Sequence, residues 1–199
     1  MGNDVRDAYS RRAREYTAAL GSLSTVHPSD LQLVNSWADQ ITGAAIDAGC
    51  GPGHWTNYLA DRGVTTHGVD LVPEFIAHAR STYPGIPFDV GNVNALNATA
   101  SGSMSGVLAW YSLIHHDPTR MQIPLREFSR VLEPGGSLLL GFFEGPTIER
   151  FEHAVAAAYR WPTRKLSDEL RATGFDISET HTRTGRGYRP HGAIVAQRI

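Results

Sequence analysis

The feature that most constrains the fold is a glycine-rich stretch at residues 46–53, which reads Ile46-Asp47-Ala48-Gly49-Cys50-Gly51-Pro52-Gly53. Residues 43–48 predict a short, buried parallel strand, and residues 54–60 predict the helix that follows it. Glycines at alternate positions remove every Cβ from the turn, so a ligand can lie against backbone N–H groups at a helix N-terminus. The stretch therefore predicts a bound small molecule.

The spacing of the glycines narrows the kind of ligand. A dinucleotide fingerprint, G-x-G-x-x-G, needs a third glycine where this chain has His54, and a phosphate-binding P-loop needs Lys followed by Ser or Thr where it has His54-Trp55. Asp47 at the end of the strand is unfavourable beside a pyrophosphate but favourable beside an ammonium or a hydroxyl. A nucleotide-binding oxidoreductase is thus the less favoured alternative.

The string from Asp47 to Gly53 resembles motif I of the class I S-adenosylmethionine-dependent methyltransferases, of the small-molecule type with a methyltransferase-11/25-like domain. The resemblance spans residues 43–198. It implies an α/β fold with a Rossmann-like seven-stranded sheet, mostly parallel with an antiparallel last strand, sandwiched by helices. It also implies S-adenosylmethionine as cofactor, S-adenosylhomocysteine as product and a small-molecule methyl acceptor.

Asp70 ends the next predicted strand, residues 64–70, and lies 23 residues beyond Asp47. An acid at this edge of the sheet can accept both ribose hydroxyl protons, although it can also cap the helix that follows. In the family the next strand is often followed by an acid near the adenine, where this chain has Asn92. The cofactor-binding residues expected on these grounds are Tyr9, Tyr16, Asp47, Gly49, Cys50, Gly51, Gly53, Asp70, Leu71, Asn92, Val93 and Trp110.

Residues 1–42 are expected to form two helices, at 4–20 and 28–40, that make a lid over the cofactor site. Tyr9, Arg12 and Tyr16 share one face of the first helix, where they either meet a ligand carboxylate or belong to an ordinary amphipathic helix. Residues 43–199 are expected to form the methyltransferase core, with a short acceptor-side insertion at residues 144–162.

Residues 110–116 follow the predicted fourth strand and should face the transferred methyl group, because ligands bind outside the carboxyl ends of central strands. Three consecutive polar residues, His115-His116-Asp117, project differently and make a poor chelate, so no metal is expected. A neutral imidazole is a competent base, so His115 is a catalytic candidate together with Tyr111, although His115 can also simply hold the loop. Glu144 is a second candidate base.

The insertion contains an arginine between two aromatic residues, Tyr159-Arg160-Trp161, which offers stacking walls and an anion clamp or packs against the sheet. The expected substrate-binding residues are Tyr111, His115, Tyr159, Arg160 and Trp161.

The rest of the chain predicts supporting elements. Residues 94–105 are small and polar and favour a flexible connection over a helix. Pro134-Gly135 favours a type II turn. Residues 163–173 favour a helix that stops at Gly174. Residues 175–183 and 192–197 favour two strands of a hairpin, joined by residues 184–191.

Composition limits the partners. A chain of 199 residues fits one domain, and a net charge of −2 provides no general attraction to nucleic acid. The single cysteine excludes an internal disulfide and favours a reducing, cytoplasmic setting. With no stretch near the ~20 apolar residues of a membrane span, no membrane partner is expected. We expect a monomer or homodimer, and we keep a non-catalytic S-adenosylmethionine-binding regulatory protein as an alternative function.

Overall fold

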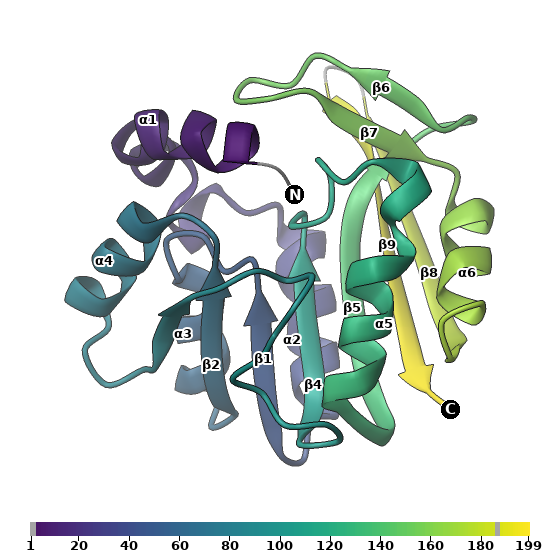
Figure 1. Cartoon of the computed structure of the whole chain (residues 1–199), viewed down its shortest axis with the longest axis horizontal. Helices are drawn as coiled ribbons and strands as arrows, with labels where there is room; N and C mark the ends of the chain where they lie inside the picture. The colour runs from purple at the N-terminus through teal and green to yellow at the C-terminus, as the bar shows by residue number, and fades with distance from the viewer. Residues whose placement is uncertain (1–2, 186–187) are drawn as a thin grey trace.

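The computed structural model describes residues 3–185 and 188–199, and in this part of the chain nine strands form one sheet (Figure 1). Six strands, β1–β5 and β7, run parallel, β9 is antiparallel to β5, and β8 pairs antiparallel with the far side of β9. The α/β class with an antiparallel last strand is therefore confirmed. The order across the sheet is β3 (Phe88–Val90), β2 (Thr65–Asp70), β1 (Ala44–Ala48), β4 (Met104–Trp110), β5 (Leu132–Glu144), β9 (Tyr188–Arg198) and β8 (Phe175–Gly185).

Helices cover both faces because successive residues of the central strands point in opposite directions. Leu108 and Leu139 pack against helices α2 and α3 on one face, while Val107 and Leu138 pack against α5 and α6 on the other. The helices and 3-10 turns are α1 (Asn3–Leu20), η1 (Leu23–Thr25), α2 (Pro28–Ala38), α3 (His54–Asp61), α4 (Pro73–Thr82), η2 (Pro118–Arg120), α5 (Gln122–Val131) and α6 (Thr163–Arg171).

Two strands come in addition to the seven expected from the sequence. Within the predicted insertion, β6 (Glu149–Phe151) and β7 (Ala158–Trp161) form an antiparallel pair. Phe143 of β5 pairs with Arg160 of β7, beyond the point where β4 has ended. Figure 1 shows this pair and α1 above the carboxyl ends of the central strands. Both segments therefore lie at the edge where the glycine loop lies.

The C-terminal hairpin has longer strands than expected. We predicted a connection at residues 184–191, but β8 continues to Gly185, which pairs with Tyr188 at the start of β9. The polar residues of this stretch do not alternate, so they gave no strand signal, yet their backbones still pair. Residues 186–187 of the predicted connection lie outside the described residues.

The connection between β3 and β4 is irregular, as expected, but it is not loose. Arg130 of α5 donates hydrogen bonds to the carbonyl oxygens of Leu96 (3.1 Å) and Thr99 (3.0 Å). A guanidinium from a neighbouring helix thus supplies the order that the small, polar sequence does not suggest.

Among residues 3–185 and 188–199, no helix combines the length and apolar composition needed to span a bilayer.

The glycine loop lies so close to the end of β4 that a side chain would not fit there. Gly49 has a φ of +86°, and a Cβ on it would lie 2.2 Å from the Cβ of Ser112. Gly63, after α3, has the same φ of +86° but no atom within 4 Å of its Cβ position. An alanine at Gly63 would therefore meet only backbone strain, whereas an alanine at Gly49 would meet both backbone strain and a clash with Ser112.

We therefore predict that Gly63→Ala lowers the free energy of unfolding by about 1–2 kcal/mol through strain alone. Gly49→Ala should lower it by a further 1–3 kcal/mol, roughly, because Ser112 must move. Urea unfolding of both variants measures the difference. Equal losses would show that the contact with Ser112 carries no energetic weight.

Candidate functional site

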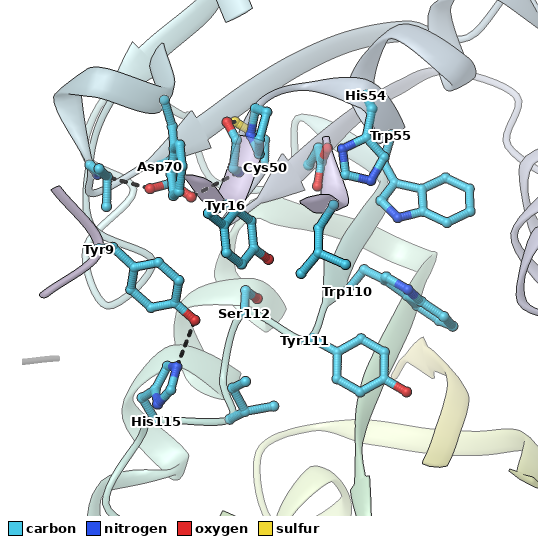
Figure 2. A pocket seen from close by; sticks show the side chains of 18 of the residues that line it. Tyr9, Tyr16, Cys50, His54, Trp55, Asp70, Trp110, Tyr111, Ser112 and His115 are labelled. Atoms are coloured by element: carbon cyan, nitrogen blue, oxygen red, sulfur yellow. Dashed lines mark hydrogen bonds between the residues drawn. The ribbon is translucent and has the colours of Figure 1, made fainter. Parts of the chain in front are cut away.

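A cavity of about 520 Å³ opens at the carboxyl ends of the central strands (Figure 2). Such a volume is ordinary for a small-molecule site. The glycine loop and Asp70 form one side of the cavity, and Ser112, Tyr111 and His115 form the other. Residues of α1, β5, β8 and β9 complete the walls. The cavity therefore lies where the crevice rule for open α/β sheets places a ligand.

The glycine loop contributes space more than hydrogen-bond donors. The N–H groups of Gly49 and Cys50 donate to the carbonyl oxygen of Val69 (2.7 and 3.0 Å), and the Gly51 N–H donates to Oδ2 of Asp70 (2.9 Å). These groups are thus already paired, contrary to the expectation that they face a ligand. A Cβ on Gly51, by contrast, would have no atom within 4 Å. The backbone at Gly51 is open to a ligand.

Asp70 holds the loop and faces the cavity at the same time. Its Oδ1 accepts a hydrogen bond from the Val72 N–H (2.8 Å), and its Oδ2 accepts the bond from Gly51. The Val72 bond fixes the turn that leads into α4, while the binding of ribose by Asp70 stays a prediction. Burial raises its pKa to about 6, with the backbone hydrogen bonds opposing the rise. Each carboxylate oxygen retains acceptor capacity for a ligand hydroxyl.

Asp47 lines the cavity from a buried position and is 1% exposed. Its Oδ2 accepts a hydrogen bond from Oγ1 of Thr56 on α3 (2.7 Å). Burial raises the pKa of Asp47 to about 7, and the nearby charge of Asp70 adds to the rise. Asp47 thus has a structural role, because its carboxylate connects β1 to α3. Its expected role beside an ammonium group stays a prediction.

The expected adenine side is formed by the ends of β2 and β3. Leu71, Asn92 and Val93 line the cavity there. The Asn92 side-chain oxygen accepts a hydrogen bond from the Asn94 N–H (3.0 Å), so it also shapes its own turn. The expected cofactor residues that line the cavity are Tyr9, Tyr16, Asp47, Gly49, Cys50, Gly51, Asp70, Leu71, Asn92, Val93 and Trp110.

Gly53 is the one expected cofactor residue that does not line the described cavity. A Cβ on it would lie 2.9 Å from Ala79 and from Phe88. Gly53 therefore allows α4 and β3 to approach the loop.

The acceptor side contains two tyrosine–histidine pairs. The Tyr9 hydroxyl lies 2.8 Å from Nε2 of His115, and the Tyr111 hydroxyl is hydrogen-bonded to Nδ1 of His191 on β9. Tyr111 has a φ of +56°, and it is the only described residue other than glycine with a positive φ. Strain of this kind is typical of functional sites. The structure thus places both catalytic candidates, Tyr111 and His115, in the cavity.

A second cavity of about 240 Å³ lies behind Tyr111. The two cavities share the residues Asp30, Trp110, Tyr111, Arg183 and His191. Arg183 donates to Asp30 (2.7 Å). The pair Asp30–Arg183 and the pair Tyr111–His191 therefore belong to the wall between the two spaces.

The structure does not bring the cluster Tyr159, Arg160 and Trp161 to the main cavity. Trp161 is 2% exposed and belongs to the core, and the Tyr159 N–H donates to the Ile114 carbonyl oxygen (2.8 Å). Arg160 lies 4.7 Å from the ring centroid of Phe151 and 3.4 Å from Glu149. Pairing of β7 with β5 determines these orientations. These three residues therefore pack against the sheet, which was the alternative to acceptor binding.

Two further candidates also lie elsewhere. Arg12 does not line the described cavity; it pairs with Glu15 (2.6 Å) and donates a hydrogen bond to the carbonyl oxygen of Ala154. Glu144 ends β5 without lining the described cavity.

Sequence reasoning missed several residues of the cavity wall. Ser112 lies within residues 110–116, which were expected to face the methyl group, but it was not named as a site residue. His54 directly follows the glycine loop, and its place at the start of α3 was a usable signal. The others come from segments distant in sequence, and no local pattern indicates them. They include Phe143, His153, Arg183, Tyr188 and His191.

The sheet order and the cavity at its carboxyl edge are typical of doubly wound α/β proteins that bind nucleosides. Residues 45–136 match the family model described as a methyltransferase domain. This match, together with the relatives and the solved structure described next, supports a class I S-adenosylmethionine-dependent methyltransferase.

Relatives of known function are similar over much of the chain. A ubiquinone biosynthesis O-methyltransferase of Xanthomonas oryzae is 29% identical over 160 residues, which cover 76% of this chain and 64% of that protein. A malonyl-[acyl-carrier protein] O-methyltransferase of Erwinia billingiae is 26% identical over 157 residues, covering 78% of this chain and 58% of that protein. The chain thus spans less than two thirds of the length of these relatives.

A solved structure shares the fold at low identity. It is the Burkholderia thailandensis 1,6-didemethyltoxoflavin-N1-methyltransferase with bound 1,6-didemethyltoxoflavin and S-adenosylhomocysteine. It matches with a TM-score of 0.80 and 18% identity, covering 98% of this chain and 88% of that one.

The buried carboxyl of Asp47 predicts a pH dependence of stability. Its pKa in the folded protein is about 7, above the value of about 3.9 of an unfolded chain. Between these values the folded state binds more protons, so the free energy of unfolding falls as the pH rises from 4 to 7. Asp47→Asn keeps an oxygen for Thr56 and should reduce this slope by up to about 1.4 kcal/mol per pH unit.

Urea unfolding at several pH values measures the slope. Asp61→Asn, at the exposed end of α3, is the matched control and should leave it unchanged. An unaltered slope in Asp47→Asn would contradict the prediction.

Proposed function

We propose that this protein is an S-adenosylmethionine-dependent methyltransferase that acts on a small molecule. One observation carries the proposal: at the carboxyl edge of the sheet, Gly51 leaves its Cβ position open while Asp70 presents a half-buried carboxylate to the same cavity. A nucleoside needs both a backbone that it can approach closely and an acceptor for its ribose hydroxyls. The match of residues 45–136 to the methyltransferase domain model and the names of the relatives support the same proposal.

The chain's own residues suit the parts of this cofactor. Asp70 would accept hydrogen bonds from the ribose hydroxyl groups. The adenine would be surrounded by Leu71, Asn92 and Val93. The methionine part would be lined by Gly49, Cys50 and Trp110. When bound, S-adenosylmethionine supplies an electrophilic methyl group on a sulfonium. The protein then contributes orientation and exclusion of water, because the transfer disperses positive charge.

The proposal gives the N-terminal helices the role of a lid. Tyr9 and Tyr16 of α1 line the cavity, and they pack with Val72 and Phe75 at the start of α4. Residues 1–42 would therefore close over the cofactor, as the sequence predicted. Burial and the charge of Asp70 raise the pKa of Tyr16 to about 12, so it stays a neutral hydrogen-bond donor.

On the acceptor side the proposal rests on Tyr111 and His115, which line the cavity. Tyr159, Arg160 and Trp161 are left out because they lie outside it. The relatives are named as O-methyltransferases of ubiquinone biosynthesis and of a malonyl-carrier substrate, which supports a small acceptor group. The proposal also includes a cytoplasmic monomer or homodimer with no nucleic-acid partner, in line with the free, buried Cys50 and the net charge of −2.

Two alternatives make different predictions. A non-catalytic regulatory protein would bind S-adenosylmethionine without consuming it, and a nucleotide-binding oxidoreductase would bind NAD(P)H instead. Calorimetric titration with both cofactors, followed by transfer of a radiolabelled methyl group to a panel of small acceptors, separates the three. Binding with no transfer to any acceptor favours the regulatory protein.

We predict that Asp70→Asn weakens binding of S-adenosylhomocysteine about 10- to 100-fold, because hydrogen bonds to a charged group are lost. Gly51→Ala should abolish binding, since its methyl group would occupy the open space. Isothermal titration calorimetry measures both effects.

Gly63→Ala is the matched control for Gly51→Ala, because both place alanine at a positive φ with no atom near the Cβ position. It should lose similar stability and bind normally. Normal binding by Gly51→Ala would place the cofactor elsewhere and contradict the proposal.

A further inference from the structure

The ring of His115 is held in one tautomer by its two hydrogen bonds. Its Nδ1 lies 2.8 Å from the carbonyl oxygen of Ala157, and its Nε2 lies 2.8 Å from the hydroxyl of Tyr9. A carbonyl oxygen can only accept, so Nδ1 carries the proton and Nε2 presents a lone pair. The Tyr9 hydroxyl therefore donates to Nε2, as the dashed line in Figure 2 marks.

The phenol of Tyr9 reaches His115 from a distant part of the chain. Its ring packs edge-on against Tyr16 (5.5 Å between centroids) and Phe75 (6.0 Å), and the hydroxyl end points at His115 (Figure 2). Both residues of the pair line the cavity. The structure thus contains a phenol bound to a basic nitrogen inside the proposed acceptor site.

The surroundings of this bond suit a flat, uncharged molecule. His153 lies edge-on to His115 (5.5 Å between centroids), Phe143 lies 5.7 Å from His153, and Tyr111 lies 5.2 Å from Phe143. Among the described residues that line the cavity, Arg183 alone is an arginine or lysine, and it is paired with Asp30. A carboxylate acceptor would have to compete with Asp30 for this charge.

We propose that the Tyr9 hydroxyl holds the place of the acceptor hydroxyl, and that the acceptor is a neutral aromatic hydroxyl compound that donates to Nε2 of His115. This inference rests on the proposed function and names the substrate class of the same site. On binding, the acceptor displaces Tyr9 and takes over its hydrogen bond.

The step that follows balances without any further reactant. The acceptor oxygen forms a bond to the methyl carbon while the carbon–sulfur bond breaks, and the bonding electron pair stays on the sulfur. The acceptor proton passes to Nε2 of His115, which later releases it to water. Burial lowers the pKa of His115, against the hydrogen bond to Ala157, so the ring is neutral near pH 7. The titratable groups that face it are Tyr9, His153 and the adjacent His116.

The test titrates the full-length protein, saturated with S-adenosylhomocysteine, with three probes of similar size: catechol, aniline and benzoate. Catechol should bind at least about 10-fold more tightly than the other two, and with S-adenosylmethionine it should be the methylated probe. This ranking uses the unaltered protein, so it needs no variant to fold. Preferred binding or methylation of aniline or benzoate overturns the proposal, as does binding of none of the three.

Two variants test the place-holding role. Tyr9→Phe should bind catechol about 3- to 10-fold more tightly, because the acceptor no longer displaces an internal hydrogen bond. His115→Gln should lose about 100-fold or more in catechol methylation while S-adenosylhomocysteine binding stays unchanged.

Matched controls are Tyr83→Phe, directly after α4, and His78→Gln, at an exposed position of α4; neither residue lines the cavity, and both variants should behave like the unaltered protein. Weaker catechol binding by Tyr9→Phe, or full activity of His115→Gln, overturns the inference. A failure of S-adenosylhomocysteine to bind the unaltered protein would instead contradict the proposed function, so the two failures are distinguishable.

Discussion

The hydrogen bond from the Gly51 N–H to the Asp70 carboxylate is the interaction on which the site depends. It joins the loop after β1 to the end of β2, two neighbouring parallel strands, and it orients Asp70 within the cavity. The second oxygen of Asp70 holds Val72 at the start of α4, against which α1 packs. One carboxylate therefore links the loop, the sheet and the proposed lid. A neutral replacement would weaken all three connections at once.

Two buried carboxylates near one another carry a cost. Burial raises the pKa of both Asp47 and Asp70, and their mutual repulsion adds to that of Asp47. The protein offsets this cost locally, with Thr56 bonding to one and backbone N–H groups bonding to the other. Functional sites commonly retain such destabilising charge because a ligand needs it. A bound cation or hydroxyl would relieve part of it.

The sequence predicted those parts of the fold and site that depend on local spacing. The glycine loop and Asp70 belong to one strand–loop–helix–strand unit, β1–α3–β2, so their positions relative to one another were predictable. The positions of His153 and His191 were not, because they depend on how β7 and β9 pair with the distant strand β5. The same pairing turned Tyr159, Arg160 and Trp161 away from the cavity. Alternation along a strand indicates two faces, but pairing decides which one meets a ligand.

The wall between the two cavities limits the size of the site. The bond between Tyr111 and His191 crosses from the end of β4 to β9, and it holds Tyr111 at a φ of +56°. Tyr111 lines both the space of about 520 Å³ and that of about 240 Å³, so its side chain lies at the boundary between them. The position of this one side chain therefore limits the size of molecule that the larger space can hold. Relatives with the same sheet can differ in what they admit without any change in backbone path.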